Sequence, residues 1–270
     1  MDLSKIQLIV TDMDGTLLNP QERPSAVFFE QFKKLQALDV HFVAASGRQY
    51  NSIAQKLAPI KDHITIVGEN GSIIKRKDKL LRLHTMNSNH IFAILPILRR
   101  IQDIFIILCG EDSAYIESKN PKLVDMLMEY YGTHQVVENF TSVIARTSIL
   151  KIALYHPKSS EEYIYPHLRS SKDHFLLKIS GKNWLDLSSP HSNKGTALKI
   201  IQKEMNITDE ETVVFGDYLN DLEMLQCAYF SYAMKNAHPE VLKTARFTTD
   251  SNANLGVEKV IAKVIEAKNS

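Results

Sequence analysis

The chain has little cysteine, and the two thiols that it has are isolated. Cys109 and Cys227 are the only cysteines among 270 residues, and each lies in an apolar stretch. They are too few for a zinc cluster or a disulfide framework, so we expect reduced core thiols in a cytoplasmic protein. The sequence also lacks an apolar run of membrane-spanning length and an export signal at its start. We therefore expect a protein that is neither membrane-bound nor exported.

The chain has almost no net charge. Its 32 Lys and Arg residues oppose 31 Asp and Glu residues, which gives a formal net charge of +1. No global field then favours nucleic acid or an anionic membrane. The ten histidines lack HxH or HExxH spacing, so they do not indicate a zinc site. We expect a small soluble ligand bound by local groups, no nucleic-acid or membrane partner, and a monomer or homodimer.

The chain is rich instead in short apolar runs that end in polar loops. A run at 6–10 ends in TDMDGT, VHFVAA at 40–45 ends in SGR, and ITIV at 64–67 ends in GENG. Between the first two runs, apolar residues recur at helical spacing after Pro24. Buried strands separated by helices predict an α/β fold with a Rossmann-like, doubly wound parallel sheet.

The pattern changes between about residue 72 and residue 187. Strand-like runs such as FIILC and ILKIALYH are separated there by amphipathic helical segments, one of them at 121–131. From Lys194 the first pattern returns. We expect a core domain built from residues 1–81 and 189–270, with a smaller α/β domain inserted at 82–188.

The most informative segment is DMDGTL at 12–17, directly after the first apolar run. In an extended backbone Asp12 and Asp14 point to the same side, and Gly15 allows a sharp turn that exposes amide hydrogens to an anion. A polar turn would explain an isolated DxD. The complete arrangement of apolar run, DxDGT and Leu favours a functional site.

Three further segments follow predicted strands or begin a predicted helix. Ser46 and Gly47 in AASGR offer a hydroxyl and an exposed amide, although without the other motifs a simple turn or helix cap is the better explanation. Lys194 in SNKGTAL opposes a helix dipole and calls for a local anion, unless it bends into water. In GDYLNDLEML, Asp217, Asn220 and Asp221 can face one way on a first helical turn.

The charges of these segments argue for a metal. The carboxyl ends of parallel strands meet in one crevice. Asp12, Asp14, Asp217 and Asp221 would bring four negative charges there against one positive charge from Lys194. Such a cluster needs a divalent cation, and all-oxygen ligands favour Mg²⁺ over Zn²⁺.

Together the four segments resemble the ordered motifs of the haloacid dehalogenase superfamily. The large insertion, the segment ENG at 69–71 and the segment SNKGTAL resemble features of its Cof-type sugar-phosphatase branch. The resemblance implies that Asp12 is the nucleophile, that Asp14 is the general acid and base, and that Lys194 shares in catalysis. It implies a phosphate site formed by Met13, Ser46, Gly47, Lys194 and Asn220. It implies Mg²⁺ held by Asp12, the backbone carbonyl of Asp14 and Asp217, with Asp221 in support.

The resulting prediction is a Mg²⁺-dependent phosphatase that acts through an aspartyl phosphate. Its substrate would be a phosphorylated small metabolite, such as a sugar phosphate, flavin mononucleotide or pyridoxal phosphate. Arg48, Asn70 and Asp186 are candidate substrate contacts, although Asp186 also fits a plain strand. A phosphomutase of the same superfamily and a non-catalytic phosphometabolite-binding module are the alternatives.

Overall fold

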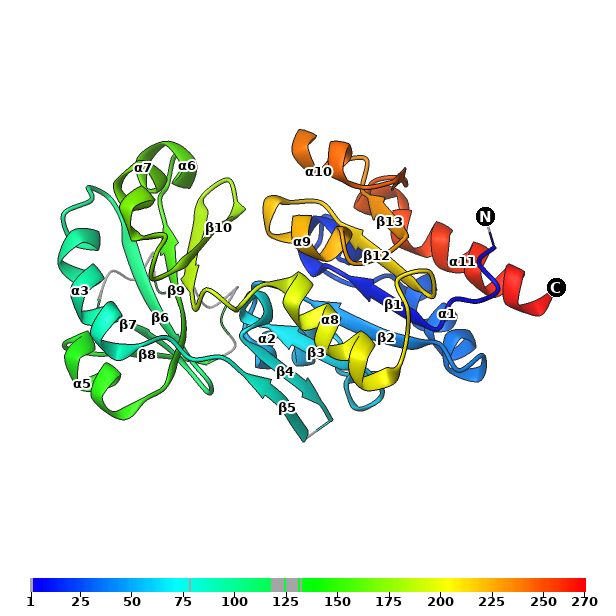
Figure 1. Cartoon of the computed structure of the whole chain (residues 1–270), viewed down its shortest axis with the longest axis horizontal. Helices are drawn as coiled ribbons and strands as arrows, with labels where there is room; N and C mark the ends of the chain where they lie inside the picture. The colour runs from blue at the N-terminus through cyan, green and yellow to red at the C-terminus, as the bar shows by residue number, and fades with distance from the viewer. Residues whose placement is uncertain (1, 78, 118–123, 125–130, 132) are drawn as a thin grey trace.

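The computed structural model of the chain describes residues 2–77, 79–117, 124, 131 and 133–270. They form two β-sheets that lie side by side along the long axis of the molecule, each with its own helices (Figure 1). The strands are β1 (Leu8–Thr11), β2 (His41–Ala45), β3 (Thr65–Gly68), β4 (Ile73–Arg76), β5 (Lys79–Leu83), β6 (Phe105–Gly110), β7 (Ala114–Ile116), β8 (His134–Val136), β9 (Ile149–Tyr155), β10 (Leu176–Gly181), β11 (Trp184–Ser188), β12 (Thr212–Gly216), β13 (Phe230–Ala233) and β14 (Phe247–Thr248). The helices are α1 (Ala26–Ala37), α2 (Tyr50–Lys56), α3 (Ser88–Leu98), α5 (Phe140–Arg146), α6 (Ser160–Tyr163), α7 (Tyr165–Leu168), α8 (Lys194–Met205), α9 (Leu222–Leu225), α10 (Pro239–Thr244) and α11 (Gly256–Asn269).

The large sheet has the strand order β14-β13-β12-β1-β2-β3-β4-β5. Its first six strands are parallel to one another, which confirms the predicted doubly wound α/β fold. The central strands β1 and β12 are buried along their whole length, as parallel strands covered on both faces must be. The hairpin β4–β5 pairs antiparallel at the edge. Antiparallel strands of a hairpin need no crossover helix between them. The alternation of strand and helix therefore stops near residue 72 although the large sheet continues through β4 and β5.

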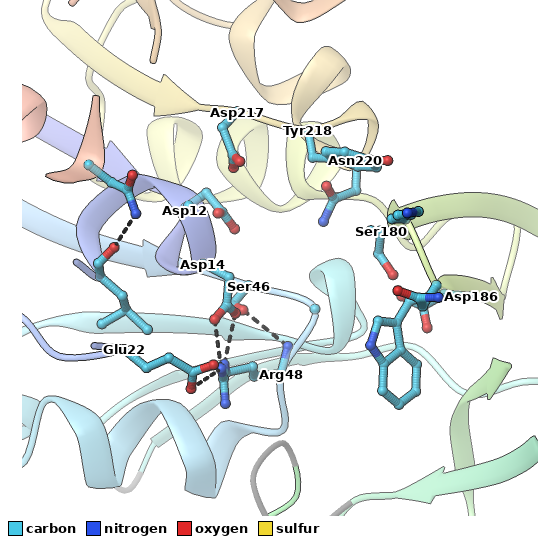
Figure 2. Close-up of a pocket in the computed structure, with 18 of the residues that line it drawn as sticks. Asp12, Asp14, Glu22, Ser46, Arg48, Ser180, Asp186, Asp217, Tyr218 and Asn220 are labelled. Atoms are coloured by element: carbon cyan, nitrogen blue, oxygen red, sulfur yellow. Dashed lines mark hydrogen bonds and ion pairs between the residues drawn. The ribbon is translucent and has the colours of Figure 1, made fainter. Parts of the chain in front are cut away.

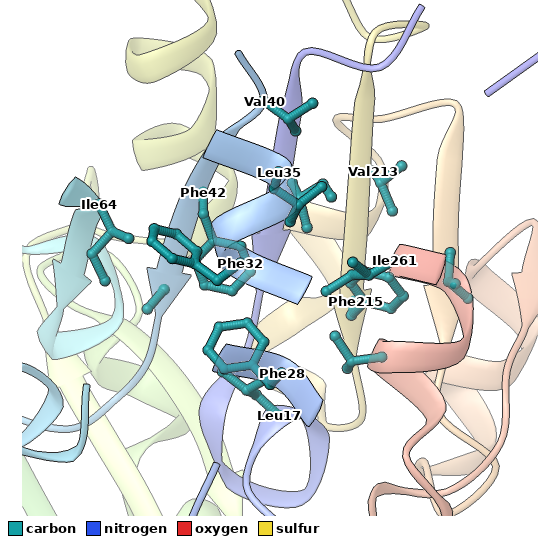
Figure 3. Close-up of a cluster of buried hydrophobic side chains, with 14 of the residues drawn as sticks. Leu17, Phe28, Phe32, Leu35, Val40, Phe42, Ile64, Val213, Phe215 and Ile261 are labelled. Carbon is teal, nitrogen blue, oxygen red and sulfur yellow. The ribbon is translucent and has the colours of Figure 1, made fainter. Parts of the chain in front are cut away.

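Helices cover both faces of the large sheet, and the alternation along each strand divides the core in two. On one face, Phe28 and Phe32 of α1 pack on Phe42 of β2, and the Phe28 and Phe42 ring centroids are 5.1 Å apart (Figure 3). Helix α11 packs beside α1 on that face. On the other face, α8, α9 and α10 bury apolar residues against Val10 and Val214. The two layers hold the strands rigidly, so the loops at their carboxyl ends have fixed positions.

The small sheet has the strand order β10-β11-β9-β6-β7-β8 and is antiparallel except for the pair β7–β8. Helices α3, α5 and α7 pack on one of its faces. The helix predicted at 121–131 lies outside the described residues, apart from Val124 and Tyr131. The second face of the small sheet carries Lys151, Ala153 and Tyr155 of β9, and part of it lines the pocket described below.

Within the described part of the chain, no helix combines the length and the apolar character that crossing a bilayer requires.

Candidate active site

Polar side chains gather where the central strands of the large sheet end. Asp12 follows β1, Ser46 follows β2, and Asp217 follows β12, three strands that are neighbours in the sheet. Lys194 begins α8, which packs over the same edge. Figure 2 shows Asp12, Ser46 and Asp217 directed toward a single pocket. The structure therefore brings the four sequence segments to the carboxyl edge of the parallel strands.

The chain turns sharply after Asp12. Residues Met13–Leu17 close into one wide turn, in which Asp14 has extended backbone angles of φ −77° and ψ 125°, and Asp12 just before it is extended as predicted. Gly15 has φ 75°, and a Cβ there would lie 2.2 Å from Oδ2 of Asp217, so only glycine lets the two loops approach. The Met13 side chain is buried in the core, which leaves its backbone as the part that can reach a phosphate.

Asp14 is held apart from Asp12 by an arginine. Arg48 donates from Nε to Oδ2 of Asp14 at 2.7 Å and from Nη2 to Oδ1 at 2.6 Å. The same guanidinium pairs with Glu22 at 3.0 Å. The Asp14 side chain is 44% exposed, whereas that of Asp12 is 7% exposed. The two carboxylates therefore sit in different surroundings, which suits two different chemical roles.

Lys194 is a fully buried cation between two carboxylates. Its Nζ donates to Oδ1 of Asp12 at 2.5 Å and to Oδ1 of Asp221 at 2.7 Å. Burial lowers the pKa of the Lys194 ammonium, but the two carboxylates raise it by more, so this pKa lies above its ordinary value. Asn193 caps α8 by accepting from the backbone N–H of Thr196 at 2.7 Å. The carboxylates thus offset the unfavourable interaction of Lys194 with the helix dipole.

Asp221 also fixes the loop after β12. Its Oδ2 accepts from the backbone N–H of Asp217 at 2.9 Å and from that of Tyr218 at 3.1 Å. Thr16 donates to Oδ1 of Asp217 at 3.1 Å. One carboxylate oxygen each from Asp12, Asp217 and Asp221 lies within 4.8 Å of the others. These three acidic side chains come from segments about 200 residues apart and form a single oxygen cluster.

The electrostatics of this cluster fit a divalent cation. Burial raises the pKa of Asp12 to about 7, and Lys194 opposes this rise only in part. Burial, with Asp12 as the next cause, raises the pKa of Asp217 well above its usual range. One ammonium cannot neutralise three carboxylates. All donors are oxygens, and one carboxylate oxygen from each of the three residues lies within 4.8 Å of the others, so the residues present fit Mg²⁺.

A second set of contacts links the loops that follow β2, β3 and β12 to the small sheet. The Ser46 hydroxyl accepts from the backbone N–H of Arg48 at 3.1 Å. Asn220 donates from Nδ2 to Oδ1 of Asn70 at 3.0 Å, and Asn70 donates from Nδ2 to Oδ2 of Asp186 at 2.6 Å. Asp186 lies on β11 of the small sheet and is buried. The candidate substrate contact Asp186 is thus placed at the site by Asn70.

Comparison with known proteins identifies the family. A family model of haloacid dehalogenase-like hydrolases matches residues 9–261. The chain belongs to this family. It is 31% identical over 264 residues to a 5-amino-6-(5-phospho-D-ribitylamino)uracil phosphatase of Escherichia coli, with 97% of both chains covered. A Streptococcus mutans protein, SMU.1108c, has a crystal structure with a TM-score of 0.89 and 29% identity, covering 97% of this chain and 99% of that one.

The same comparisons support the predicted branch and enzyme class. A subclass IIB sugar phosphatase, BT4131, shares the fold with a TM-score of 0.82 at 19% identity, over 95% of this chain and 98% of the other. The family model and the E. coli relative confirm the predicted resemblance to the Cof-type phosphatase branch, and this haloacid dehalogenase-like hydrolase is a phosphoric monoester hydrolase.

The pocket of this hydrolase lies between the two sheets and has a volume of about 610 Å³. That size suits a small organic ligand. The predicted residues that line it are Asp12, Asp14, Ser46, Gly47, Arg48, Asp186, Asp217 and Asn220. Met13, Asn70, Lys194 and Asp221 are not among the lining residues. Lys194, Asn70 and Asp221 contribute by holding residues that do line it.

Several lining residues were not predicted from the sequence. Two aromatic rings come from the small sheet, Tyr155 of β9 and Trp184 of β11, and a third is that of Tyr131, which lies outside the strands. The ring centroid of Trp184 is 5.0 Å from that of Tyr155 and 6.5 Å from that of Tyr131. Glu22, which pairs with Arg48, was also missed. Lys151 had a visible signal, a single charge within the apolar run ILKIALY. The aromatic residues had none, since nothing in the sequence around them differs from an ordinary buried segment.

Proposed function

We propose that this enzyme hydrolyses phosphate monoesters of small metabolites by transferring the phosphoryl group to Asp12. The observation that carries the proposal is the buried ion pair of Lys194 with Oδ1 of Asp12 at the end of β1. It fixes the carboxylate and leaves Oδ2 as the attacking atom. A nucleophile needs such fixed orientation because misplacement by a fraction of an ångström slows attack strongly.

The reaction has two steps in this proposal. Oδ2 of Asp12 attacks phosphorus, and the bond from phosphorus to the ester oxygen breaks as Asp14 gives that oxygen a proton. Asp14 then takes a proton from water, whose oxygen attacks the aspartyl phosphate and releases inorganic phosphate. Ser46 and Asn220 hold the phosphoryl oxygens during both steps, and Lys194 acts through Asp12, whose Oδ1 it binds at 2.5 Å. Asp14 is half-exposed, so it can exchange its proton with solvent between turnovers.

Asp12, Asp217 and the backbone carbonyl of Asp14 would hold Mg²⁺. The ion would supply positive charge that offsets the carboxylates and the phosphate. Asp221 keeps Lys194 and the Asp217 loop in place through its hydrogen bonds. We assign Asp221 a supporting role and not a metal-binding one, because it is fully buried and both of its oxygens accept hydrogen bonds from protein donors.

Residues 82–188 act in this proposal as an inserted domain that covers the site and selects the leaving group. This segment supplies Tyr131, Tyr155 and Trp184, which form an aromatic wall of the same pocket. Aromatic faces suit a planar ring or the apolar face of a sugar. A suitable substrate panel contains sugar phosphates, flavin mononucleotide, pyridoxal phosphate and the phosphorylated ribitylaminouracil that the E. coli relative's name specifies.

The test is Asp12→Asn, measured as inorganic phosphate released from the panel and from p-nitrophenyl phosphate. We expect release to fall at least a thousandfold, because an amide does not attack phosphorus. The matched control is Asp209→Asn, since Asp209 also pairs with a lysine of α8 but is exposed. Near-normal release by the Asp12 variant would exclude the covalent mechanism. Transfer of the phosphoryl group to another position of the same sugar, with a bisphosphorylated activator present and without release of inorganic phosphate, would indicate a phosphomutase instead.

A further inference from the structure

Lys151 is a buried cation that the proposed chemistry does not use. It lies in the middle of β9, where the other residues are apolar or aromatic, and its side chain is 3% exposed. An ammonium removed from water loses its hydration, so its position is set by the oxygens that replace that water. Those oxygens show what Lys151 does.

The oxygens around Lys151 come from both sheets. Its Nζ donates to the carbonyl oxygen of Gly47 at 2.6 Å and lies 2.8 Å from Oε2 of Glu69. Oδ1 of Asp186, on the neighbouring strand β11, lies 3.4 Å away. Gly47 and Glu69 belong to the loops that follow β2 and β3 of the large sheet. The ammonium therefore joins the small sheet to two loops of the large one.

The first of these loops is the phosphate-binding loop Ser46–Arg48. Lys151 binds the carbonyl of the Gly47–Arg48 peptide, and the N–H of that same peptide donates to the Ser46 hydroxyl at 3.1 Å. A peptide is planar, so fixing its carbonyl also fixes the direction of its N–H. Lys151 thus determines how the Ser46 hydroxyl is held.

The second loop is the turn Glu69–Gly71, whose backbone is strained. Glu69 and Asn70 have φ values of 51° and 55°, in the left-handed region that costs free energy for residues with a Cβ. Lys151 binds Glu69, and Asp186 binds Asn70. Asn70 in turn donates through its backbone N–H to the carbonyl of Ser46 at 3.0 Å and accepts from Asn220. The small sheet therefore supports both phosphate-binding side chains, Ser46 and Asn220.

We propose that Lys151 is a positioning residue for phosphoryl transfer, which fixes the loop Ser46–Arg48 when the small sheet docks on the large one. This inference rests on the proposed phosphatase function. The inference predicts that replacing Lys151 slows hydrolysis even of a substrate that is too small to need the aromatic wall. A residue that only selects the leaving group would have no such effect.

The test substitutes Lys151→Met, which keeps most of the side-chain length and removes the donor. We measure kcat for p-nitrophenyl phosphate and the inhibition constant of inorganic phosphate, both with Mg²⁺ present. We expect kcat to fall about tenfold to a hundredfold, and phosphate to inhibit about tenfold more weakly, as loss of a charge-assisted hydrogen bond at the site implies.

The matched control is Lys178→Met. Lys178 of β10 also pairs across the sheets, with Glu223 of α9, but it has no contact with Gly47 or Glu69 in the described structure. We expect both quantities to stay within about twofold of wild type. An equal loss in the control would overturn the inference, because any pair between the sheets would then suffice.

Two other results would also overturn it. The first is a Lys151→Met enzyme with normal kcat for p-nitrophenyl phosphate and normal phosphate inhibition. The second is a loss confined to metabolite substrates, which would make Lys151 a substrate contact. Should the single variant fail to fold by circular dichroism, Lys151→Met with Glu69→Gln removes the closest buried ion pair, and normal phosphate inhibition in that variant would overturn the inference.

Failure of the proposed function gives a different result. A wild-type enzyme that released no phosphate from any substrate would refute the phosphatase proposal by itself. Calorimetric titration of wild type and Lys151→Met with inorganic phosphate still tests the positioning role. Weaker phosphate binding by the variant supports the role, and equal binding contradicts it.

Discussion

The substitution Lys194→Met tests the buried charge cluster most directly. Lys194 has no exposed side-chain surface, and its Nζ lies 2.5 Å from Asp12 and 2.7 Å from Asp221. With Asp217, the cluster contains three carboxyl groups. Removing the ammonium therefore takes the one positive charge of Lys194 from these groups without opening a route for water.

The size of the effect follows from the burial. Removing one partner of a buried ion pair costs about 3–5 kcal/mol, because the other charge stays desolvated and unpaired. The entropy of unfolding is about 2.1 cal/mol/K per residue, and the chain has 270 residues, so 1 kcal/mol corresponds to about 2 °C in Tm. We expect Tm to fall by about 5–9 °C in the absence of Mg²⁺.

A matched control exists on the same helix. Lys199 of α8 pairs with Asp209 at the same 2.7 Å, but both side chains are about half exposed. Exposed pairs contribute about 0–1 kcal/mol, so Lys199→Met is expected to lower Tm by no more than about 2 °C. The comparison keeps the residue type, the substitution and the helix constant. It varies the burial of the lysine and the number of carboxylates that it contacts.

The assay is thermal unfolding of wild type, Lys194→Met and Lys199→Met, each with a chelator and with excess Mg²⁺. We expect Mg²⁺ to raise Tm more in Lys194→Met than in wild type, because the more negative cluster gains more from a divalent cation. Equal Tm values for the two variants would refute the reasoning about the buried cluster. Insensitivity of every Tm to Mg²⁺ would argue against a metal at these carboxylates.

Three further predictions concern catalysis, metal and pH. Asp14→Asn should lower kcat by several orders of magnitude while phosphate still inhibits, because only proton transfer is lost; a normal kcat would contradict its role as general acid and base. Phosphate release should stop with a chelator and return when Mg²⁺ or Mn²⁺ is added. Ca²⁺ should inhibit it, because Ca²⁺ takes more oxygen ligands and can occupy both oxygens of Asp12. Full activity in excess chelator would exclude a required metal. Burial, with Arg76 as a second cause, lowers the pKa of His41 in the folded protein from 6.5 to about 4. As the pH falls, His41 of the unfolded chain therefore binds a proton before His41 of the folded chain does. The free energy of unfolding then decreases between about pH 6.5 and pH 4. The free energy of unfolding in urea should change between pH 7 and pH 4 by about 3 kcal/mol less in His41→Gln than in wild type. An equal change in both proteins would show that His41 does not cause the pH dependence.

The sequence alone determined the sheet and the order of the motifs. Apolar runs of four to six residues, each followed by a polar loop, can bury their backbone only as central strands. Parallel strands place those loops at one edge, so Asp12, Ser46 and Asp217 had to meet. The charge imbalance of the loops was also visible in the sequence. For these reasons the parallel sheet, the family and the enzyme class could be predicted without coordinates.

Only the tertiary structure decided which carboxylates lie together. The turn at Met13–Leu17 directs Asp14 to Arg48, whereas Asp221 joins Asp12 and Asp217. Residue spacing could not show this, because it depends on how closely two loops approach at Gly15. Side-chain direction in a loop is set by neighbours distant in sequence and carries no periodic signal.

The junction of the two sheets was likewise decided by tertiary contacts. Lys151 contacts Gly47, which is 104 residues away in the sequence, and the aromatic wall comes from segments that look in the sequence like any other buried segment. Local sequence specifies which face of a strand is buried, but not which surface covers that face. The phosphate end of the pocket could therefore be predicted from the sequence, whereas the wall that meets the leaving group depends on how the small sheet packs.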